Sequence, residues 1–373
     1  METYIQALLF VLFLVCFIVQ LYFPIANHKV LNNYTPEEEL PTVKLPISVI
    51  ISARNEAQNL RENLPSILEQ KYKNFEVVVV NDCSSDSSDE VLEEFKHKYK
   101  NLKVVTITEH VRFKTGKKFA LTLGIKAAKH EHLLFTDADC QPASENWITR
   151  MASNFIGDTQ IVLGYSPYYK TNNFLNTLIR FETLKTGINY LSAALNGDAY
   201  MAIGRNLAYT KTLFFGAKGF AAHMRVVSGD DDLFVNQNAT ANNTVIEINP
   251  ETFVFTSAKT TVASLYRQKK RHMGVGKLYK NRHRKILSID AVTGFLFYAS
   301  LIGGLCYRFE AFFVALGLFL LRLIIQVFIY HKTFKKLGEA RLLWYLPLLD
   351  FVYYFYLNIF GLIGTFIKTR QWK

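Results

Sequence analysis

Carboxylates occur in two short clusters whose spacing suits metal and base chemistry. Asp137 and Asp139 stand one residue apart directly after an apolar run, so a bend there can direct two oxygen ligands toward Mg²⁺ or Mn²⁺. Asp230, Asp231 and Asp232 are consecutive, and crowding of like charges raises the pKa of at least one carboxyl, which can make a general base. Surface turns and helix N-caps carry similar clusters, so neither cluster is specific alone.

Two further polar turns could bind a charged ligand. Lys114, Gly116 and Lys117 precede a helix-like segment, so ammonium groups and free helix amides can converge on an anion. The spacing is not that of a P-loop, and a solvated basic turn is the alternative. Asp82 stands in a serine-rich run that includes Ser84, where it can accept hydrogen bonds from a base or ribose, or cap the next helix.

Regular alternation of strands and helices would position these clusters. Strands are expected at about 45–52, 75–80, 102–108 and 132–136, and helices at about 57–70, from the serine-rich turn to about 98, and at 117–129. This order favours an α/β fold with a mostly parallel sheet covered on both faces, whose ligands gather at the carboxyl ends of the strands. The polar clusters at 53–56, 81–86 and 137–139 stand at three such ends.

Composition and long apolar runs place part of the chain in lipid. Half of the 373 residues are hydrophobic and 20% are charged, which excludes a disordered chain, and the scattered cysteines exclude a disulfide framework. The stretch 4–23 is long enough to span a bilayer and lacks the basic start of a cleavable signal peptide. Further runs cover about 287–307, 311–330 and 342–367. Pro347 and Asp350 interrupt the start of the last run, which leaves an interfacial or re-entrant piece as an alternative.

The chain therefore divides into four parts. We expect an N-terminal membrane anchor (1–28), an α/β domain (40–258), basic interfacial helices (259–286) and C-terminal membrane helices (287–373). The net charge is +12, and residues 259–285 hold ten Lys or Arg and no acid. Since Lys and Arg are retained on the cytoplasmic face, we expect an integral protein of the inner or cytoplasmic membrane with its catalytic domain in the cytoplasm. The basic stretch abuts a membrane helix, which favours contact with anionic headgroups over nucleic acid.

Arg322 falls near the middle of the third apolar run, where an unpaired charge is costly. One hypothesis is that Arg322 faces a path for a lipid phosphate or glycan between the helices. The alternative is that its side chain snorkels to the interface or that the boundary of the run is shifted.

Taken in order, the motifs resemble inverting family 2 glycosyltransferases with the GT-A fold, in the membrane-bound branch that includes cellulose and hyaluronan synthases and ceramide glucosyltransferase. The resemblance runs from about Ile47 to Tyr279 and implies a nucleotide-sugar donor, with a UDP-sugar favoured by family frequency. It also implies roles for individual residues. These are nucleotide-sugar binding by Ala53, Arg54, Glu56, Asp82, Ser84, Lys114, Gly116, Lys117 and Asp137, binding of Mg²⁺ or Mn²⁺ by Asp139 and Asp137, and proton removal from the acceptor by Asp231 beside Asp230.

The resemblance also implies an acceptor and diphosphate region, formed by Gly204, Arg205, Asn206, Gln268, Arg271 and His272. The membrane branch carries Gln-x-x-Arg-Trp after the base, and His272 replaces the Trp here, which argues against processive polymerisation. The leading interpretation is transfer of one sugar to a lipid-linked or glycolipid acceptor at the cytoplasmic membrane face. The alternative is a processive polysaccharide synthase that secretes its product. A non-catalytic membrane scaffold is disfavoured because Asp82, Asp139 and Asp231 are intact.

Overall fold

The computed structural model describes residues 2–39, 41–42, 44–108, 116–224, 226, 228–306 and 312–366. Lys114, predicted to lie near a diphosphate, falls outside these residues, and so do the side chains of Arg271 and His272.

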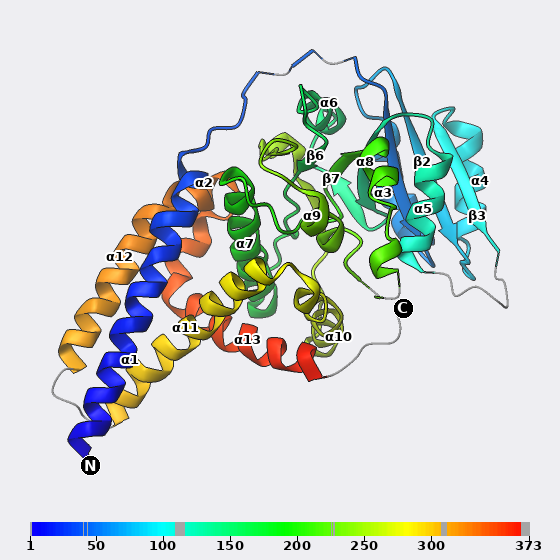
Figure 1. The fold of residues 1–373 in the computed structure, drawn as a ribbon. Helices are drawn as coiled ribbons and strands as arrows, with labels where there is room; N and C mark the ends of the chain where they lie inside the picture. The colour runs from blue at the N-terminus through cyan, green and yellow to red at the C-terminus, as the bar shows by residue number, and fades with distance from the viewer. Residues whose placement is uncertain are drawn as a thin grey trace.

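A mixed sheet with the strand order β3-β2-β1-β4-β7-β6-β8 forms the centre of the polar domain (Figure 1). Four strands are mutually parallel: β1 (Ile47–Ala53), β2 (Phe75–Asp82), β3 (Leu102–Ile107) and β4 (His132–Asp137). Three follow beyond β4: β7 (Leu207–Thr210) antiparallel to β4, β6 (Ile161–Leu163) antiparallel to β7, and β8 (Thr244–Ile246) parallel to β6. A separate antiparallel pair joins β5 (Cys140–Pro142) to β9 (Val254–Thr256). The predicted α/β class and mostly parallel sheet are confirmed.

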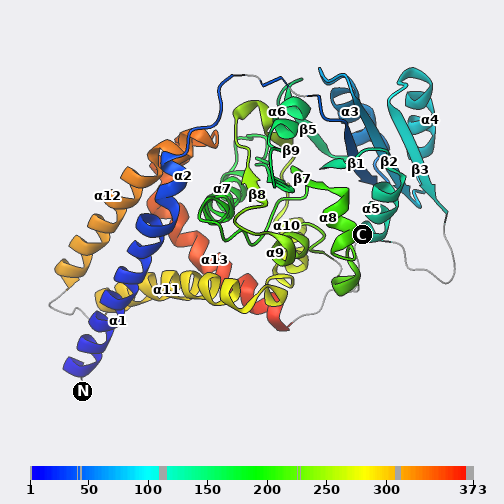
Figure 2. The ribbon, with the colours of Figure 1, turned by 45° about the horizontal axis from the view of Figure 1, so that its top comes forward.

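Helices cover both faces of this sheet. One face packs against α3 (Ala57–Leu68), α4 (Ser88–Lys98) and α6 (Trp147–Ser153), and the other against α5 (Lys117–Ala127), α8 (Lys211–Gly216) and α9 (Asp232–Asn238) (Figure 2). Within β1, the side chains of Val49 and Ile51 pack in the hydrophobic core on the α3 side of the sheet. Ile50 packs in the core on the α5 side. All seven residues of β1 are buried, which explains why its sequence is continuously apolar rather than alternating.

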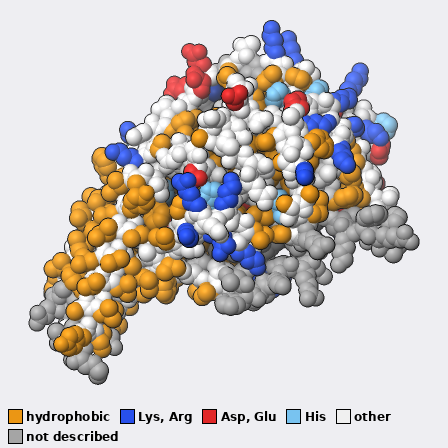
Figure 3. Space-filling model, in the orientation of Figure 1, with side chains coloured by type: hydrophobic (Ala, Val, Ile, Leu, Met, Phe, Trp, Pro, Cys, Tyr) orange, Lys and Arg blue, Asp and Glu red, His pale blue; other side chains and the backbone are white. Residues whose placement is uncertain are grey.

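An apolar helical bundle projects from the domain (Figures 1 and 3). It contains α1 (Glu2–Tyr22), a π-helical turn (Phe23–His28), α2 (Lys29–Asn33), α11 (Asn281–Cys306), α12 (Phe312–Lys336), a 3₁₀ segment (Ala340–Tyr345) and α13 (Leu346–Phe366). Within the described chain, four segments are long and apolar enough to cross a membrane, namely Tyr4–Asn33, Asn281–Cys306, Phe312–Lys336 and Ala340–Leu362. In Figure 3, Lys and Arg side chains gather where the apolar surface meets the domain.

Two predicted boundaries of the membrane helices are corrected. The first helical segment continues past residue 28 to Asn33, because Pro24 is accommodated in a π-helical turn rather than ending the helix. The basic segment predicted to end at 286 overlaps α11, which begins at Asn281. Pro347 lies in the first turn of α13, where a missing backbone N–H breaks no helical hydrogen bond, so that segment is a continuous helix.

Two helices connect the bundle with the domain. The first, α7 (Phe174–Leu195), lies between the bundle and the sheet in both ribbon views (Figures 1 and 2). The second, α10 (Val262–Met273), lies close to α13. Short 3₁₀ turns complete the fold at Ala221–His223, Pro250–Thr252 and Gly276–Leu278.

Both interpretations of Arg322 are wrong, because its side chain is paired inside the bundle. Arg322 and Asp350 are each 1% exposed, and their side chains meet at 2.9 Å. The Asp350 carboxylate also lies 3.3 Å from Lys185 of α7 and accepts a hydrogen bond from Tyr298. Arg322 donates a second hydrogen bond, to the Gln20 side chain of α1. The charge that interrupted the apolar pattern at Asp350 is therefore the partner of the charge at Arg322.

Replacement of Asp350 by Asn removes the negative charge and leaves Lys185 and Arg322 buried without it. Loss of one partner of a buried ion pair typically costs about 3–5 kcal/mol. We expect Asp350→Asn to lower the thermal unfolding midpoint of the full chain, measured in detergent, by a clearly detectable amount. Leu348→Ala, at a side chain that is 54% exposed on the same helix, is the matched control and should change it little. Equal midpoints for Asp350→Asn and wild type would show that the pair does not stabilise the bundle.

Candidate functional site

A cavity of about 900 Å³ opens at the carboxyl ends of β1 and β4. It is closed by the turn before β7, the start of α9, and helices α7 and α10. Ser52 of β1 is in register with Asp137 of β4, and the strand order reverses between these two strands, which is where ligands bind in open α/β sheets. The cavity brings together many of the predicted site residues: Arg54, Glu56, Lys117, Asp137, Asp139, Gly204, Arg205, Asp230, Asp231 and Gln268.

Several residues predicted to contact the nucleotide sugar do not line this cavity. Ala53 and Asp82 are fully buried at the ends of β1 and β2. The Ser84 hydroxyl accepts a hydrogen bond of 2.9 Å from the backbone N–H of Asn55. Ser84 therefore joins the loop after β2 to the loop after β1. Gly116 occupies the N-cap position of α5. Nucleotide contacts by these residues stay predictions, and the geometry gives Ser84 a role in shaping the loop that carries Arg54 and Glu56.

Asp137 and Asp139 have the chemistry of a divalent-cation site. Ligand atoms of Asp137, Asp139 and Cys140 lie within 4.8 Å of one another. Partial desolvation and the Asp137 charge raise the pKa of Asp139, which is the response of carboxylates crowded beside each other. Burial raises the pKa of the Cys140 thiol well above its ordinary value, and the thiol donates a hydrogen bond to Asp139. The two carboxylates therefore fit Mg²⁺ or Mn²⁺, which prefer oxygen ligands to the sulfur of a thiol.

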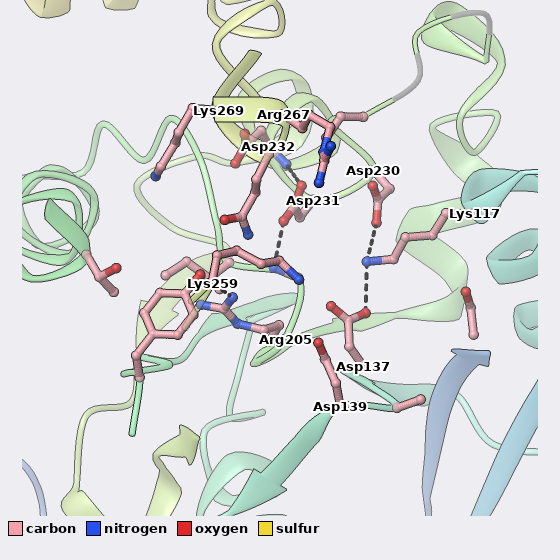
Figure 4. A pocket seen from close by; sticks show the side chains of 18 of the residues that line it. Lys117, Asp137, Asp139, Arg205, Asp230, Asp231, Asp232, Lys259, Arg267 and Lys269 are labelled. Atoms are coloured by element: carbon pink, nitrogen blue, oxygen red, sulfur yellow. Dashed lines mark hydrogen bonds and ion pairs between the residues drawn. The ribbon is translucent and has the colours of Figure 1, made fainter. Parts of the chain in front are cut away.

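Lys117 lies between the two carboxylate clusters (Figure 4). Its Nζ is 2.8 Å from Asp137 and 3.4 Å from Asp230. Burial alone would lower the pKa of Lys117, but Asp137, Asp230 and Asp231 raise it above its ordinary value, so the ammonium form persists. Lys117 is thus a fixed positive charge on the cavity wall, held at the first residue of α5.

Asp231 is held in one orientation by two backbone amides. Its Oδ2 accepts a hydrogen bond of 2.7 Å from Gly204, and its Oδ1 accepts one of 2.8 Å from Asp232. A Cβ at position 204 would lie 2.9 Å from Oδ2, so only glycine allows this contact. Burial and the Asp230 charge raise the pKa of Asp231 to about 6, although Lys117 and the two amides oppose the shift. A carboxylate with this pKa is suited to accept a proton near neutral pH.

The remaining acceptor-side predictions separate into cavity and core residues. Arg205 lines the cavity, where its guanidinium stacks on the Tyr168 ring at 4.9 Å and donates to the Tyr168 hydroxyl. Gln268 lines the opposite wall on α10. The Asn206 side chain is fully buried and bonds to Trp147 and to backbone carbonyls. The predicted acceptor contact of Asn206 is therefore corrected to a structural role, because its side chain points into the core.

Lys118, the last residue of the basic turn that leads into α5, is buried and holds backbone rather than lining the cavity. The Lys118 ammonium donates hydrogen bonds of 2.9 Å to the backbone carbonyls of His223, Val226 and Ser228. Burial lowers the pKa of Lys118 to about 8, against the raising effect of the nearby aspartates. Lys118 thereby holds the segment that leads to Asp230.

Sequence reasoning missed the cavity walls formed by α7 and α10. Glu182 of α7 forms an ion pair with Lys269 of α10 and accepts a hydrogen bond from Tyr356 of α13. Lys259 and Arg267 also line the cavity. The basic run 259–285 was the available signal, but its charge alone does not distinguish a cavity wall from a surface that contacts headgroups.

Comparison with known families gives two overlapping matches. The family model described as "Glycosyl transferase family 2" matches residues 48–227, and the one described as "Glycosyl transferase family group 2" matches residues 139–362.

Curated relatives match shorter stretches. The chain is 34% identical over 119 residues to the glycosyltransferase AglE of Haloferax volcanii, covering 31% of this chain and 38% of that protein. It is 28% identical over 134 residues to WfaP of Escherichia coli, described as a UDP-Glc:alpha-D-GlcNAc-diphosphoundecaprenol beta-1,3-glucosyltransferase, covering 35% of this chain and 49% of that protein. The matches thus span less than half the length of these relatives.

The fold is also found in a solved structure. A mannosyltransferase from Pyrobaculum calidifontis, in complex with GDP-Man and Mn²⁺, aligns with a TM-score of 0.61 over 96% of this chain and 98% of that chain, at 16% sequence identity. This likeness covers the apolar helices as well as the sheet domain.

Removal of one carboxylate tests the cation site without any assay of activity. A ligand that binds only the folded chain raises its melting midpoint with ligand concentration. We expect MnCl₂ to raise the midpoint of the full chain, and Asp139→Asn to reduce that rise strongly. Asp158→Asn, at an exposed position away from the cavity, is the control and should respond like wild type. An unchanged response of Asp139→Asn would place the bound Mn²⁺ elsewhere.

Proposed function

Because the chain belongs to glycosyltransferase family 2, we propose that it transfers one sugar from a nucleotide-sugar donor, with a UDP-sugar favoured, to a lipid-linked or glycolipid acceptor, with inversion at the anomeric carbon. Membership of the family and the GT-A fold, both predicted from the motifs, are confirmed. The observation that carries the proposal is the fixed Asp231 carboxylate, which lines the same cavity as Lys117 and the Asp137–Asp139 pair.

In the proposed reaction Asp231 removes the proton from the acceptor hydroxyl as that oxygen attacks the sugar. The two backbone amides fix the direction of the carboxylate, so the acceptor oxygen meets a base that is already oriented. Asp230 acts through Lys117, which it holds from the side opposite Asp137. Asp230 is thus a positioning residue.

The leaving nucleoside diphosphate requires positive charge. Lys117 supplies one fixed cation at the N-terminus of α5, where the helix amides also favour an anion. Asp137 and Asp139 would hold Mg²⁺ or Mn²⁺, which would supply further positive charge to stabilise the leaving diphosphate. The solved mannosyltransferase of the same fold is described with GDP-Man and Mn²⁺, which supports a nucleotide-sugar donor and a divalent cation for this chain.

A membrane lipid is the proposed acceptor. Four segments of the described chain have the length and composition of membrane helices, and α10, which lines the cavity, packs close to one of them, α13. WfaP, by its description, acts on a diphosphoundecaprenol-linked sugar, which supports an acceptor of the lipid-linked class. The run of Lys and Arg at 259–285 supports placement of the catalytic domain on the cytoplasmic side.

The test is a transfer assay on the full chain in detergent, with Mn²⁺ or Mg²⁺, total lipid extract and a panel of UDP-, GDP- and dTDP-sugars. We expect one labelled lipid product that disappears with EDTA, and its donor identifies the sugar. A long water-soluble polymer would instead support the processive synthase. Absence of both transfer and donor hydrolysis with every sugar would contradict a catalytic role.

Substitution of the proposed base tests its role directly. Loss of a general base typically slows catalysis by about 10²- to 10⁴-fold, and we expect this decrease in kcat for Asp231→Asn with little change in donor KM. Asp158→Asn is the control for a surface charge change. Near-wild-type turnover by Asp231→Asn would reject Asp231 as the base.

The pH profile provides a second test of the same carboxyl. The base acts in its ionised form, so kcat/KM for the acceptor, which reports groups of the free enzyme, should level off above pH about 6 and fall about tenfold per unit below it. The Asp230 charge contributes to the raised pKa of Asp231, so Asp230→Asn should move the acidic limb to lower pH. An acidic limb that keeps its midpoint in Asp230→Asn would show that another group titrates.

A further inference from the structure

The cavity has an acidic floor and a basic wall. Asp137 and Asp139 at the end of β4, together with Asp230, Asp231 and Asp232 at the start of α9, supply the acidic side chains. The basic side chains come from α10 and the segment just before it, where Lys259, Arg267, Lys269 and Lys270 line the cavity. A ligand that fills the cavity therefore contacts both kinds of charge.

Two of the basic side chains are available to a ligand. The ion pairs among the described residues that line the cavity join Lys117 to Asp137 and Asp230, and Lys269 to Glu182. Lys259 and Arg267 are exposed and take part in none of these pairs. In Figure 4 the Arg267 side chain reaches from α10 to the part of the cavity that holds Asp230 and Asp231.

The other side of α10 contacts a membrane helix. Leu265 is 3% exposed and packs in a cluster with Tyr168 and Ile179, against which Tyr356 of α13 also packs. The Tyr266 ring lies 5.7 Å from the ring of Phe360, also in α13. Helix α10 therefore separates the cavity from an apolar helix of a length that can cross a membrane.

These contacts limit the route by which an acceptor could reach the cavity if its apolar chain lay in the membrane beside α13. Its hydroxyl must reach Asp231 in the cavity, so the group that links hydroxyl and apolar chain passes α10 and Arg267. An anionic linking group beside the aspartates would be repelled unless cations compensate it, and Arg267 on α10 and Lys259 just before it supply those cations. A phosphate is well matched to a guanidinium, which binds it through paired hydrogen bonds.

We infer that the acceptor is a lipid that carries a phosphate or diphosphate between its apolar chain and its acceptor hydroxyl, and that Arg267 and Lys259 bind this group at the cavity wall. The inference rests on the proposed function and specifies the acceptor class. The phosphate could belong to a polyprenyl-type diphosphate or to a phosphoglycerolipid headgroup, which share the same recognition chemistry.

A binding experiment tests the inference independently of turnover. The full chain in a neutral detergent is titrated calorimetrically with farnesyl diphosphate, farnesol, inorganic pyrophosphate and short-chain phosphatidylglycerol. We expect wild type to bind farnesyl diphosphate at least tenfold more tightly than farnesol, since hydrogen bonds between charged groups are among the stronger ones. The double variant Arg267→Gln with Lys259→Gln should lose that preference.

The matched control removes the same charge from the same basic stretch. Lys277 and Lys280 are exposed and do not line the cavity, so the double variant Lys277→Gln with Lys280→Gln should keep the preference for farnesyl diphosphate. A similar loss in both double variants would show that overall charge, rather than the cavity wall, attracts the lipid.

The remaining outcomes separate the possible ligands. Tighter binding of farnesyl diphosphate than of phosphatidylglycerol supports the polyprenyl-type source, and the reverse supports the phosphoglycerolipid source. Pyrophosphate binding as tight as that of farnesyl diphosphate would overturn the lipid assignment. A rise in donor KM in the Arg267→Gln and Lys259→Gln variant, with lipid binding unchanged, would assign these cations to the donor instead. Failure of every sugar donor in the transfer assay would contradict the proposed function but leave this binding result interpretable.

Discussion

Paired charges along α7 fix the cavity relative to the membrane helices. Arg180 and Lys185 are buried on this helix, and each pairs with a carboxylate of the C-terminal bundle, Glu339 and Asp350 respectively. A buried charge that loses its partner is costly, so these pairs permit little relative movement. Glu182, on the same helix, pairs with Lys269 of α10. The cavity wall and the bundle therefore share one rigid element.

The parallel strands also crowd negatively charged side chains together at the cavity. Because β1 and β4 end at the same edge, side chains that follow them gather in one place, and the turn carrying Gly204 brings Asp231 to the same cavity. Five aspartates line this cavity, and Lys117 is the cation that links the two groups of carboxylates. Burial and the neighbouring Asp230 charge raise the pKa of Asp231, and the Asp137–Asp139 pair places two carboxylates close enough to share a cation.

The sequence predicted well what depends on local pattern. Each strand from β1 to β4 lies within about two residues of its predicted bounds, because a buried parallel strand reads as a continuous apolar run between polar turns. The residues that follow these strands could be assigned to the site for the same reason. Side-chain direction was not predictable: Arg205 faces the cavity, whereas the adjacent Asn206 points into the core.

Tertiary pairing was also beyond the sequence. Asp350 looked like an interruption of a membrane helix, and its partners Arg322 and Lys185 lie on two other helices. Helix α7 carries no motif, since its role depends on which charges it meets rather than on their spacing.

The arrangement of charges in the cavity favours different positions for the acceptor hydroxyl and for the acceptor's anionic group. Asp231 is fixed beside Asp230, and an anionic nucleophile approaching these carboxylates would be repelled and would need no base. A hydroxyl, by contrast, gains from a carboxylate that removes its proton. Arg267 on α10 and Lys259 just before it line the wall of the same cavity, where they can bind an anion that the aspartates would repel. In the proposed reaction, the two parts of the cavity would thus select two different groups of one acceptor, a neutral hydroxyl for the base and a phosphate for Arg267 and Lys259.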